Sequence, residues 1–456
     1  MNSSFVTPIP SASTSLLPGK RTVETATLII VLVIVLALFF DFTNGFHDTA
    51  NAMATPIATG ALKPKTAVLL AAVLNLVGAF LSTEVAKTIS GGMIREDEIS
   101  ATVFPAIIFA GLIGAITWNM LTWLLGLPSS SSHALFGGLI GATLVGVGFM
   151  AIDFSVVMSK VILPALIAPL TAGIIAFTVT KLAYAITRRY DSKADGRSGF
   201  RFGQIFTSSL VALAHGTNDA QKTMGVITLA LITVGWQSPE QADPQTWVIF
   251  ACAITIALGT YMGGWRIIRT LGKGLTEVKP AQGFAAESST AATILASSAL
   301  GFALSTTQVA SGSVIGSGLG RRGSQVRWRT AGRIMIGWIL TLPAAGGVGA
   351  LAALIVVWLG FWGIVIDTVL AVVIVLALFL RSRRDQVTAA NAMSEVAESG
   401  RAVKVKRNPP PTRRQRAIAR EEARRAAAEK SAVKRAEKAA KAAERTPPAP
   451  ENGGER

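Results

Sequence analysis

Residues 41–51 read DFTNGFHDTAN and follow an apolar run at 26–40 that has the composition of a membrane helix. Apolar sequence resumes near Ala54, so the polar groups of this motif lie where lipid tolerates few of them. A second polar stretch, AHGTNDAQKT at 214–223, also interrupts apolar sequence and aligns with the first when Asp48 is placed on Asp219. A polar motif that occurs twice at membrane depth is typical of the binding site of a transporter built from repeats.

A second pair of motifs supports a duplication of the chain. LPSSSSHALFGGLIGA begins at Leu127 and LSTTQVASGSVIGSG begins at Leu304, which aligns SSSH at 130–133 with STTQ at 305–308. The spacing from the aspartate motif is 84 residues in the first copy (Asp48 to Ser132) and 88 in the second (Asp219 to Thr307). Two motif pairs in the same order, at nearly equal spacing, therefore predict two homologous halves.

The composition is that of a membrane protein. Of the 456 residues, 51% are hydrophobic and 15% are charged, and the mean hydropathy is +0.50; globular domains in water carry about 25% charged residues. The single cysteine, Cys252, excludes an intramolecular disulfide framework. Residues 381–456 hold 20 Lys and Arg against 10 Asp and Glu. Such a tail could bind nucleic acid or anionic lipid, but we interpret it as a solvated tail and expect no nucleic acid partner.

The order of apolar segments predicts an all-α polytopic membrane protein. We expect the first helix to break after Asn51, where Pro56 and Pro64 flank Gly60, and to re-enter the membrane. Further spanning helices are expected at 66–85, 103–127 and 156–187. The predicted parts are a disordered segment at 1–22, a first membrane repeat at 23–187, a cytoplasmic linker at 188–201, a second membrane repeat at 202–380 and a disordered basic tail at 381–456. The positive-inside rule places the basic loops and the C-terminus in the cytoplasm.

Asp48 and Asp219 are the strongest candidates for a coupling site. An unpaired carboxylate in hydrocarbon is costly or takes up a proton, so each needs a cation or a proton beside it. Asn51 follows Asp48 by three residues and lies on the same helical face, whereas Lys222 holds this position after Asp219. We expect the Lys222 ammonium to stand where a sodium ion would otherwise balance Asp219.

All three histidines of the chain, His47, His133 and His215, fall in the repeated motifs. They could be packed core residues, but ionisable groups at membrane depth are costly and usually functional, so we favour a place in the site and proton relay as their chemistry. No spacing of His, Cys and carboxylate residues resembles a metal site, and no nucleotide motif occurs. Neither a metal site nor a cofactor is predicted.

The hydroxyl clusters suit an oxyanion. A helix start offers unpaired N–H groups and the positive end of the helix dipole, and neutral hydroxyls add further donors. A capping function for Ser130 and Ser305 would need only one hydroxyl each, so the clusters exceed that need. The candidate oxyanion-binding hydroxyls, which would suit phosphate or sulfate, are those of Ser130, Ser131, Ser132, Ser305, Thr306 and Thr307.

The remaining acids at membrane depth receive different interpretations. Glu287, in GFAAESSTAATILAS, is either a helix-start carboxylate or a ligand of the coupling ion, and both readings stay open. Asp41, Glu84 and Asp367 lie nearer the ends of apolar runs, so we expect helix ends to explain them.

Taken together, GFHDTANA, AHGTNDAQKTMGVI, PSSSSHA and LSTTQ resemble the Pit family of inorganic phosphate transporters, and more narrowly its bacterial low-affinity, proton-coupled members. The resemblance covers about residues 24–380. It implies two inverted-topology repeats with broken or re-entrant helices and about 10–12 membrane segments, often in a homodimer, in the cytoplasmic membrane. It also implies symport of phosphate with a cation. The lipid bilayer is expected to surround the protein.

The resemblance assigns residues one by one. Asp48 and Asp219 match the family's paired aspartates, with Asn51 and Asn218 beside them, and the hydroxyl clusters match its phosphate-side groups. Glu287 matches the glutamate of the family's GFxxE segment. Two departures are informative. Sodium-coupled members carry Asn where this chain has Lys222, which favours protons as the coupling ion. Many members carry His where Gln308 stands, which disfavours a symmetric pair of relay histidines.

Several rival functions remain compatible with the motifs. Similar bacterial proteins take phosphate as a neutral complex with a divalent metal. A sodium-coupled phosphate symporter, a permease for another oxyanion such as sulfate, and a passive anion channel also fit. An intramembrane hydrolase using Ser132, His133 and Asp48 is disfavoured, because neighbouring residues on a helix point in different directions. We therefore predict that the protein is not an enzyme.

Overall fold

The computed structural model describes residues 20–90, 94, 103–190, 198–238 and 240–389. The predicted disordered tail beyond 389 and nearly all of the predicted disordered segment at 1–22 lie outside these residues. Within the described ranges the chain is helical, with isolated β-bridges and no strand. The α-helices are α1 Lys20–Ala58, α2 Pro64–Gly78, α3 Glu84–Ser90, α4 Phe104–Leu124, α5 Ser131–Gly146, α6 Phe154–Val156, α7 Leu163–Tyr190, α8 Ser198–Thr233, α9 Thr246–Met262, α10 Trp265–Arg269, α11 Pro280–Ala299, α12 Thr306–Gly320, α13 Trp328–Leu359 and α14 Phe361–Ser382.

Several of these helices are long and apolar enough to cross a membrane, which confirms the all-α membrane fold. In the described residues they are Thr27–Ala58 in α1, Phe104–Leu124, Phe154–Thr187, Trp328–Leu359 and Phe361–Ser382. Thr246–Met262 and Trp265–Gly272 would together form one more span, bent by 57°. The bend falls at Gly263, whose φ of +71° is a conformation that glycine adopts without a steric penalty.

The expected break after Asn51 is wrong. α1 continues through residues 41–51 and ends at Ala58, two residues beyond Pro56. A proline so close to the end of a helix removes one backbone hydrogen bond and leaves the preceding turns intact. The chain reverses instead at Gly60, where φ is +73°.

The next expected boundaries also shift. α2 begins with a proline at its first turn and ends at Gly78, so the helix predicted at 66–85 is shorter, and a separate α3 follows from Glu84. The predicted linker at 188–201 is helical at both ends, because α7 runs to Tyr190 and α8 starts at Ser198. Its central residues, 191–197, lie outside the described part of the chain.

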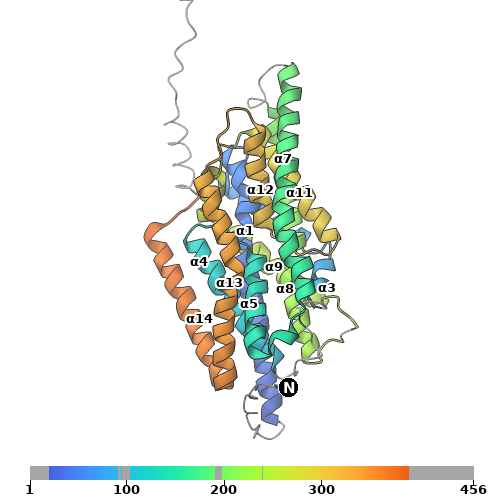
Figure 1. The fold of residues 1–456 in the computed structure, drawn as a ribbon, viewed down its shortest axis with the longest axis vertical. Coiled ribbons are helices and arrows are strands. Elements are labelled where there is room, and N and C mark those ends of the chain that lie inside the picture. The colour runs from blue at the N-terminus through green and yellow to red at the C-terminus, as the bar shows by residue number, and fades with distance from the viewer. Residues whose placement is uncertain (1–19, 91–93, 95–102, 191–197, 239, 390–456) are drawn as a thin grey trace, which may run out of the picture. The chain divides into compact units, whose positions relative to one another are not determined.

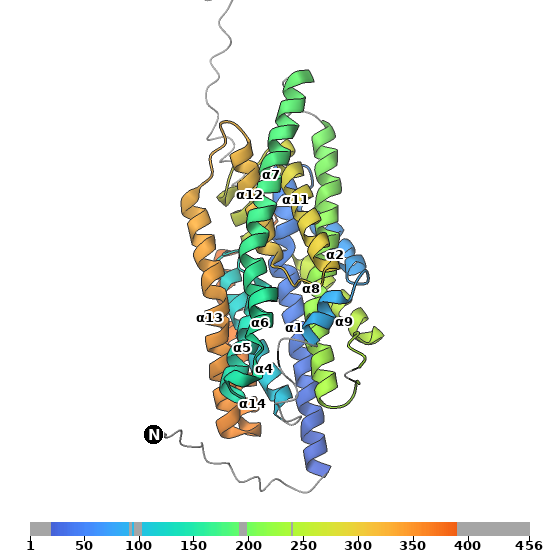
Figure 2. The ribbon, with the colours of Figure 1, turned by 45° about the vertical axis from the view of Figure 1, so that its right-hand side comes forward.

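α1 and α8, which carry the two aspartate motifs, pack against each other in opposite directions (Figure 2). Near one end of the contact the Thr223 hydroxyl donates to the Asp41 carboxylate at 3.0 Å. Near the other end the Thr59 hydroxyl donates to the Gln204 side-chain oxygen at 2.7 Å. Asp48 and Asp219 therefore come together in the middle of the pair.

Each of these two helices crosses a helix of the other half at a glycine. A Cβ atom at Gly45 of α1 would lie 2.3 Å from the Ile256 carbonyl oxygen of α9. A Cβ atom at Gly216 of α8 would lie 2.2 Å from the Asn75 carbonyl oxygen of α2. Because neither position has room for a side chain, α1 meets α9 as closely as α8 meets α2.

A second pair of helix crossings at glycine residues likewise joins helices of the two halves. Gly137 of α5 lies against the Leu342 carbonyl of α13, and Gly312 of α12 lies against the Pro169 carbonyl of α7. In both cases an added Cβ atom would be 2.3 Å from the carbonyl oxygen. α14 packs outside this arrangement, on α13 and α4 (Figure 1). The central helices α1, α5, α8 and α12 thus each cross a neighbour at close range near the polar motifs.

Candidate functional site

The starts of α5 and α12 are preceded by non-helical backbone. Residues 127–130 and 302–305 are extended segments between apolar helices. The Ser130 hydroxyl accepts a hydrogen bond from the His133 backbone N–H at 3.1 Å, and the Ser305 hydroxyl accepts one from the Gln308 N–H at 3.3 Å. Both serines are therefore helix caps in this structure. Of the hydroxyls that follow them, those of Ser131, Thr306 and Thr307 donate to the two aspartates.

Asp48 ties α1 to both helix starts. The Thr307 hydroxyl donates to its Oδ1 atom at 3.1 Å, and the Ser131 hydroxyl donates to its Oδ2 atom at 3.3 Å. The His47 Nδ1 atom lies 2.6 Å from Oδ1. The Asp48 side chain is buried, and these three groups are its hydrogen-bond and ion-pair partners among the described residues.

Asp219 has a matching set of partners with one addition. The Thr306 hydroxyl donates to its Oδ2 atom at 3.2 Å, and the His215 Nε2 atom lies 3.0 Å from the same oxygen. The Lys222 ammonium donates to its Oδ1 atom. Asp219 thus has a fixed positive charge beside it, which Asp48 lacks among the described residues.

The Lys222 ammonium is completely enclosed by oxygen acceptors. Besides Asp219, it donates to the Ser132 hydroxyl at 2.6 Å and to the Leu304 carbonyl at 3.0 Å. Its side chain is 1% exposed. An ammonium group has three donors, and all three are used on a carboxylate, a hydroxyl and a carbonyl. A hard cation such as sodium prefers oxygen ligands of these kinds.

The two aspartates lie close enough to bind one cation together. One ligand atom each of Asp48, His215 and Asp219 falls within 4.8 Å of the others. No metal site was predicted from the sequence, because no spacing of His, Cys and carboxylate residues along the chain resembles one. His215 and Asp219 lie one turn apart on α8, and Asp48 of α1 joins them because the two helices pack in opposite directions. All three are buried, and a cluster of two carboxylates and an imidazole can bind a cation.

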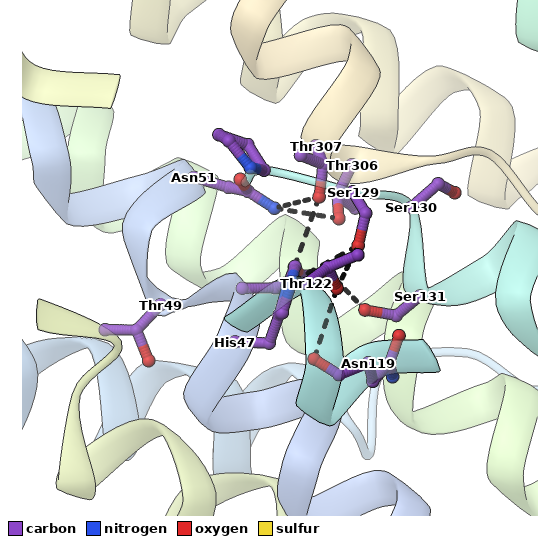
Figure 3. A network of polar contacts seen from close by, with 12 residues as sticks. His47, Thr49, Asn51, Asn119, Thr122, Ser129, Ser130, Ser131, Thr306 and Thr307 are labelled. Carbon is purple, nitrogen blue, oxygen red and sulfur yellow. Dashed lines mark hydrogen bonds and ion pairs between the residues drawn. The ribbon is translucent and has the colours of Figure 1, made fainter. Parts of the chain in front are cut away.

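The two asparagines beside the aspartates are not placed alike. The Asn51 amide donates to the Thr307 hydroxyl at 3.0 Å and to the Thr306 hydroxyl at 3.3 Å, as Figure 3 shows. The Asn218 amide instead donates to the Ser298 hydroxyl of α11 at 2.9 Å. Only Asn51 belongs to the cluster in this conformation, although both were predicted to lie on the phosphate side.

The three histidines occupy different positions around the cluster. His47 and His215 each touch an aspartate; their other ring nitrogens lie 3.3 Å from the Ser129 hydroxyl and 3.2 Å from the Asn75 side-chain oxygen, respectively. His133 makes no hydrogen bond or ion pair with either aspartate in the described part of the chain, and its Nδ1 atom lies 3.4 Å from the Gln308 amide nitrogen. His133 and Gln308, which align in the sequence, are thus in contact across the two halves.

Glu287 lies apart from this cluster, on α11. The Thr55 hydroxyl of α1 donates to its Oε1 atom, as does the Gln204 amide at 3.1 Å, and the Thr207 hydroxyl donates to its Oε2 atom at 2.8 Å. Its side chain is 3% exposed. Glu287 is therefore a buried carboxylate in the middle of α1, α8 and α11, not a helix-start group at an interface.

The structure corrects the reading of two other acids. Asp41 lies in the interior of α1 and Asp367 in the second turn of α14, and both side chains are buried, so helix ends do not explain them. Glu84 does begin α3, as expected. Several partners of the site were not singled out as site residues from the sequence, because all but Ser129, which precedes the aligned part of its serine run, are single polar residues in apolar helices and carry no pattern of their own. They are Asn75, Thr122, Ser129, Gln204 and Thr207.

Comparison with known proteins places this arrangement in context. Residues 44–349 match the model of a family described as the phosphate transporter family. A protein of Mycobacterium leprae named a probable low-affinity inorganic phosphate transporter is 56% identical over 360 residues, which cover 79% of this chain and 86% of that protein. A Bacillus subtilis protein of the same name is 42% identical over 328 residues, which cover 71% of this chain and 96% of that protein.

A solved structure shares the fold. It is a sodium-dependent phosphate transporter, aligned with a TM-score of 0.65 over 73% of this chain and 100% of that one. The two sequences are 23% identical in this alignment. The likeness therefore concerns the arrangement of helices, and the chemistry of the site must be argued from the residues of this chain.

Proposed function

The chain belongs to the phosphate transporter family, and we propose that it carries inorganic phosphate across the cell membrane by symport with protons. Membership of the family makes it a phosphate transporter and not an enzyme. The Ser132 hydroxyl, which a hydrolase would need as a nucleophile, accepts from Lys222 and donates to the Leu304 carbonyl. That arrangement leaves the hydrolase reading without structural support.

In our proposal phosphate binds between the starts of α5 and α12. The backbone N–H groups of the first turn of each helix and the positive ends of both helix dipoles favour an anion there. The hydroxyls of Ser131, Ser132, Thr306 and Thr307 provide neutral donors, with Asn51 and Asn218 at the edge. Ser130 and Ser305 contribute indirectly, by holding the helix starts in shape.

The same hydroxyls explain why the anion needs a coupling ion. Three of them now donate to the Asp48 and Asp219 carboxylates, so phosphate oxygens would compete with these carboxylates for donors. Two like charges about 5 Å apart repel by about 3 kcal/mol at an effective dielectric constant of 20. A proton or cation on the aspartates removes this repulsion and releases the hydroxyls, so phosphate and its coupling ion bind together.

The enclosure of the Lys222 ammonium is the observation that supports protons, and not sodium, as the coupling ion. It occupies an all-oxygen pocket on Asp219 that would otherwise suit a sodium ion. A fixed ammonium cannot be exchanged for sodium during each cycle. Asp48, which has His47 and no fixed cation beside it among the described residues, is then the group that takes up the transported proton, and His215 and Glu287 complete the proton-handling groups.

Reconstituted protein tests this proposal directly. Radiolabelled phosphate uptake into proteoliposomes is measured under an imposed proton gradient, and separately under a sodium gradient. Wild type should accumulate phosphate with protons alone, and Lys222→Asn should acquire a dependence on sodium, because it frees the oxygen pocket. Lys181→Asn, which removes an exposed lysine of α7 packed on Phe177, is the matched control and should behave as wild type. A wild-type protein that requires sodium would overturn the coupling argument.

The form of the substrate needs its own measurement. A neutral complex of phosphate with a divalent metal would reduce the charge brought to the aspartates, and it stays the main variant of this proposal. Uptake that disappears with a chelator and returns with a divalent cation would support it. Inhibition by arsenate, which mimics the shape and charge of phosphate, but not by sulfate would separate phosphate transport from a general oxyanion permease. Uptake that persists when the proton gradient is collapsed would favour a passive channel.

We further propose that the two halves are inverted repeats that rock about the site. The support is the antiparallel pairing of α1 with α8 and the exchanged glycine crossings, which are expected when two like halves are related by an axis in the membrane plane. A cytoplasmic C-terminus and a homodimer belong to the same proposal. Cysteine labelling of the tail in intact cells and the mass of the purified protein would test these two features.

A further inference from the structure

Asp41 is a buried carboxylate that the site described above does not use. It lies within the spanning stretch Thr27–Ala58 of α1, and its side chain is 0% exposed. The Thr223 hydroxyl of α8 donates to its Oδ1 atom at 3.0 Å, while its Oδ2 atom has no hydrogen-bond partner among the described residues. Asn44 is also buried, and neither its side-chain nitrogen nor its side-chain oxygen has a hydrogen-bond partner among the described residues.

The charged groups around Asp41 do not neutralise it. Asp219 and Lys222 of α8 and the buried Cys252 thiol of α9 are near enough to interact with it electrostatically. The Lys222 ammonium, however, is bonded to Asp219 and its two other acceptors. No described cation pairs with Asp41. A carboxylate without a counter-ion in a hydrocarbon environment is neutralised by binding a proton, and such residues commonly mark ion or proton pathways.

Asp41 belongs to a polar stripe along α1. Residues spaced by three or four positions share one face of a helix. The polar residues of this face are Asp41, Asn44, Asp48, Asn51 and Thr55. Asp41 precedes Asp48 by seven residues and Thr55, the partner of Glu287, follows it by seven, so a buried carboxylate flanks Asp48 on each side at about 10 Å along the helix.

We propose that Asp41 is a second proton-binding site of the transport cycle, on the side of the Asp48–Asp219 pair opposite to Glu287. Its carboxylate takes up a proton entering from that side of the membrane and releases it toward the aspartate pair. This inference rests on proton-coupled phosphate symport as proposed above. It adds a residue to the proton route and does not concern phosphate binding.

The test uses the full-length protein in proteoliposomes with the membrane potential clamped at zero. Wild type, Asp41→Asn, Asp41→Glu and Asp367→Asn are compared. Asp367 is the matched control, because it is also a buried aspartate with an Oδ2 atom that lacks a described partner, but it lies on α14, outside the central helices. Two quantities are measured: exchange of labelled for unlabelled phosphate without any gradient, and steady-state accumulation under a proton gradient.

One coupled proton supports about a tenfold accumulation for each pH unit of gradient, since a factor of ten equals about 1.4 kcal/mol. Asp41→Asn should therefore accumulate about tenfold less phosphate than wild type at one pH unit, with exchange retained. Asp41→Glu should restore accumulation, and Asp367→Asn should match wild type. Accumulation by Asp41→Asn equal to wild type, loss of exchange in Asp41→Asn, or an equal defect in Asp367→Asn would each overturn the inference. A wild-type protein without proton-driven accumulation would instead refute the proposed function on which it rests.

Discussion

The Lys222 ammonium of α8 donates a hydrogen bond to the Ser132 hydroxyl at the start of α5, across 2.6 Å, although 90 residues separate them. The same ammonium bonds the Leu304 carbonyl just before α12 and the Asp219 carboxylate. One buried charge thus joins a motif of the first half to two motifs of the second. Its removal should have consequences for both stability and coupling.

We predict that Lys222→Met lowers the free energy of unfolding by about 3–5 kcal/mol, because it leaves a buried carboxylate without its partner. The double variant Lys222→Met with Asp219→Asn should recover most of this loss, since no unpaired charge then remains. Thermal unfolding of the purified proteins in detergent measures both effects. A double variant as unstable as Lys222→Met would show that the ion pair is not the source of the loss.

Neutralising either aspartate of the pair should abolish transport. Asp48→Asn and Asp219→Asn keep the size of the side chain but remove the charge that binds a proton or cation, so we expect phosphate uptake at background level with normal insertion in the membrane. Asp243→Asn is the control, because Asp243 is an exposed acid that pairs with Lys87 outside the site. Full uptake by either Asp48→Asn or Asp219→Asn would rule out the assigned site.

Two variants at the start of α12 should distinguish a hydroxyl that caps the helix from a hydroxyl that binds phosphate. Ser305→Ala removes the cap and should cost about 1 kcal/mol of stability with little change in KM. Thr307→Val removes the donor to Asp48 and should raise the KM for phosphate about tenfold, as expected for one hydrogen bond to a charged group. Uptake kinetics together with thermal unfolding distinguish the two. If Ser305→Ala gives the larger KM change, the cap serine is itself a ligand.

The glycine crossings give a test of the equivalence of the halves. Gly45→Ala and Gly216→Ala would each place a Cβ atom within 2.3 Å of a carbonyl oxygen of the neighbouring helix. Overlap of this kind in a packed interior is relieved only by separating the helices, so both variants should fail to yield folded protein to a similar degree. Gly332→Ala, which has no atom within 4 Å of its added Cβ, should be neutral. Gel filtration of the detergent-solubilised proteins reports the yield.

Much of this candidate site could be predicted because most of its polar residues lie in short sequence motifs. The polar residues of the aspartate motifs and the hydroxyl clusters stand out against apolar sequence, and polar groups at membrane depth are costly unless they serve a site. The expectation that the Lys222 ammonium balances Asp219 needed only their spacing on a helix, and the structure shows the two in contact. The duplication is predicted on the same ground, since both motif pairs keep their order, and it stays a prediction.

Other features depend on contacts that no local pattern contains. The break expected at Pro56 failed because the penalty of a proline depends on how much helix follows it, and here only two residues do. Asp41 was assigned to a helix end because apolar sequence stops there, yet α1 continues and buries it against α8. The approach of Asp48 to His215 and Asp219 follows from the antiparallel packing of α1 on α8, which the sequence does not specify.

Glu287 is the remaining acid whose two readings differ in a measurable way. The Thr55, Gln204 and Thr207 side chains all donate hydrogen bonds to the Glu287 carboxylate. A carboxylate can accept from all of these donors. The amide of Glu287→Gln would instead place its own N–H groups against one of them. If Glu287 handles the coupling proton, Glu287→Gln should lower proton-driven accumulation about tenfold per pH unit and retain phosphate exchange. If it is only structural, accumulation and exchange should fall together with thermal stability. Ser288→Ala, which removes a hydroxyl bonded to its own helix at the Phe284 carbonyl, is the matched control on α11. We expect the first outcome, because a group used only for packing would not require a buried carboxylate at the junction of three helices.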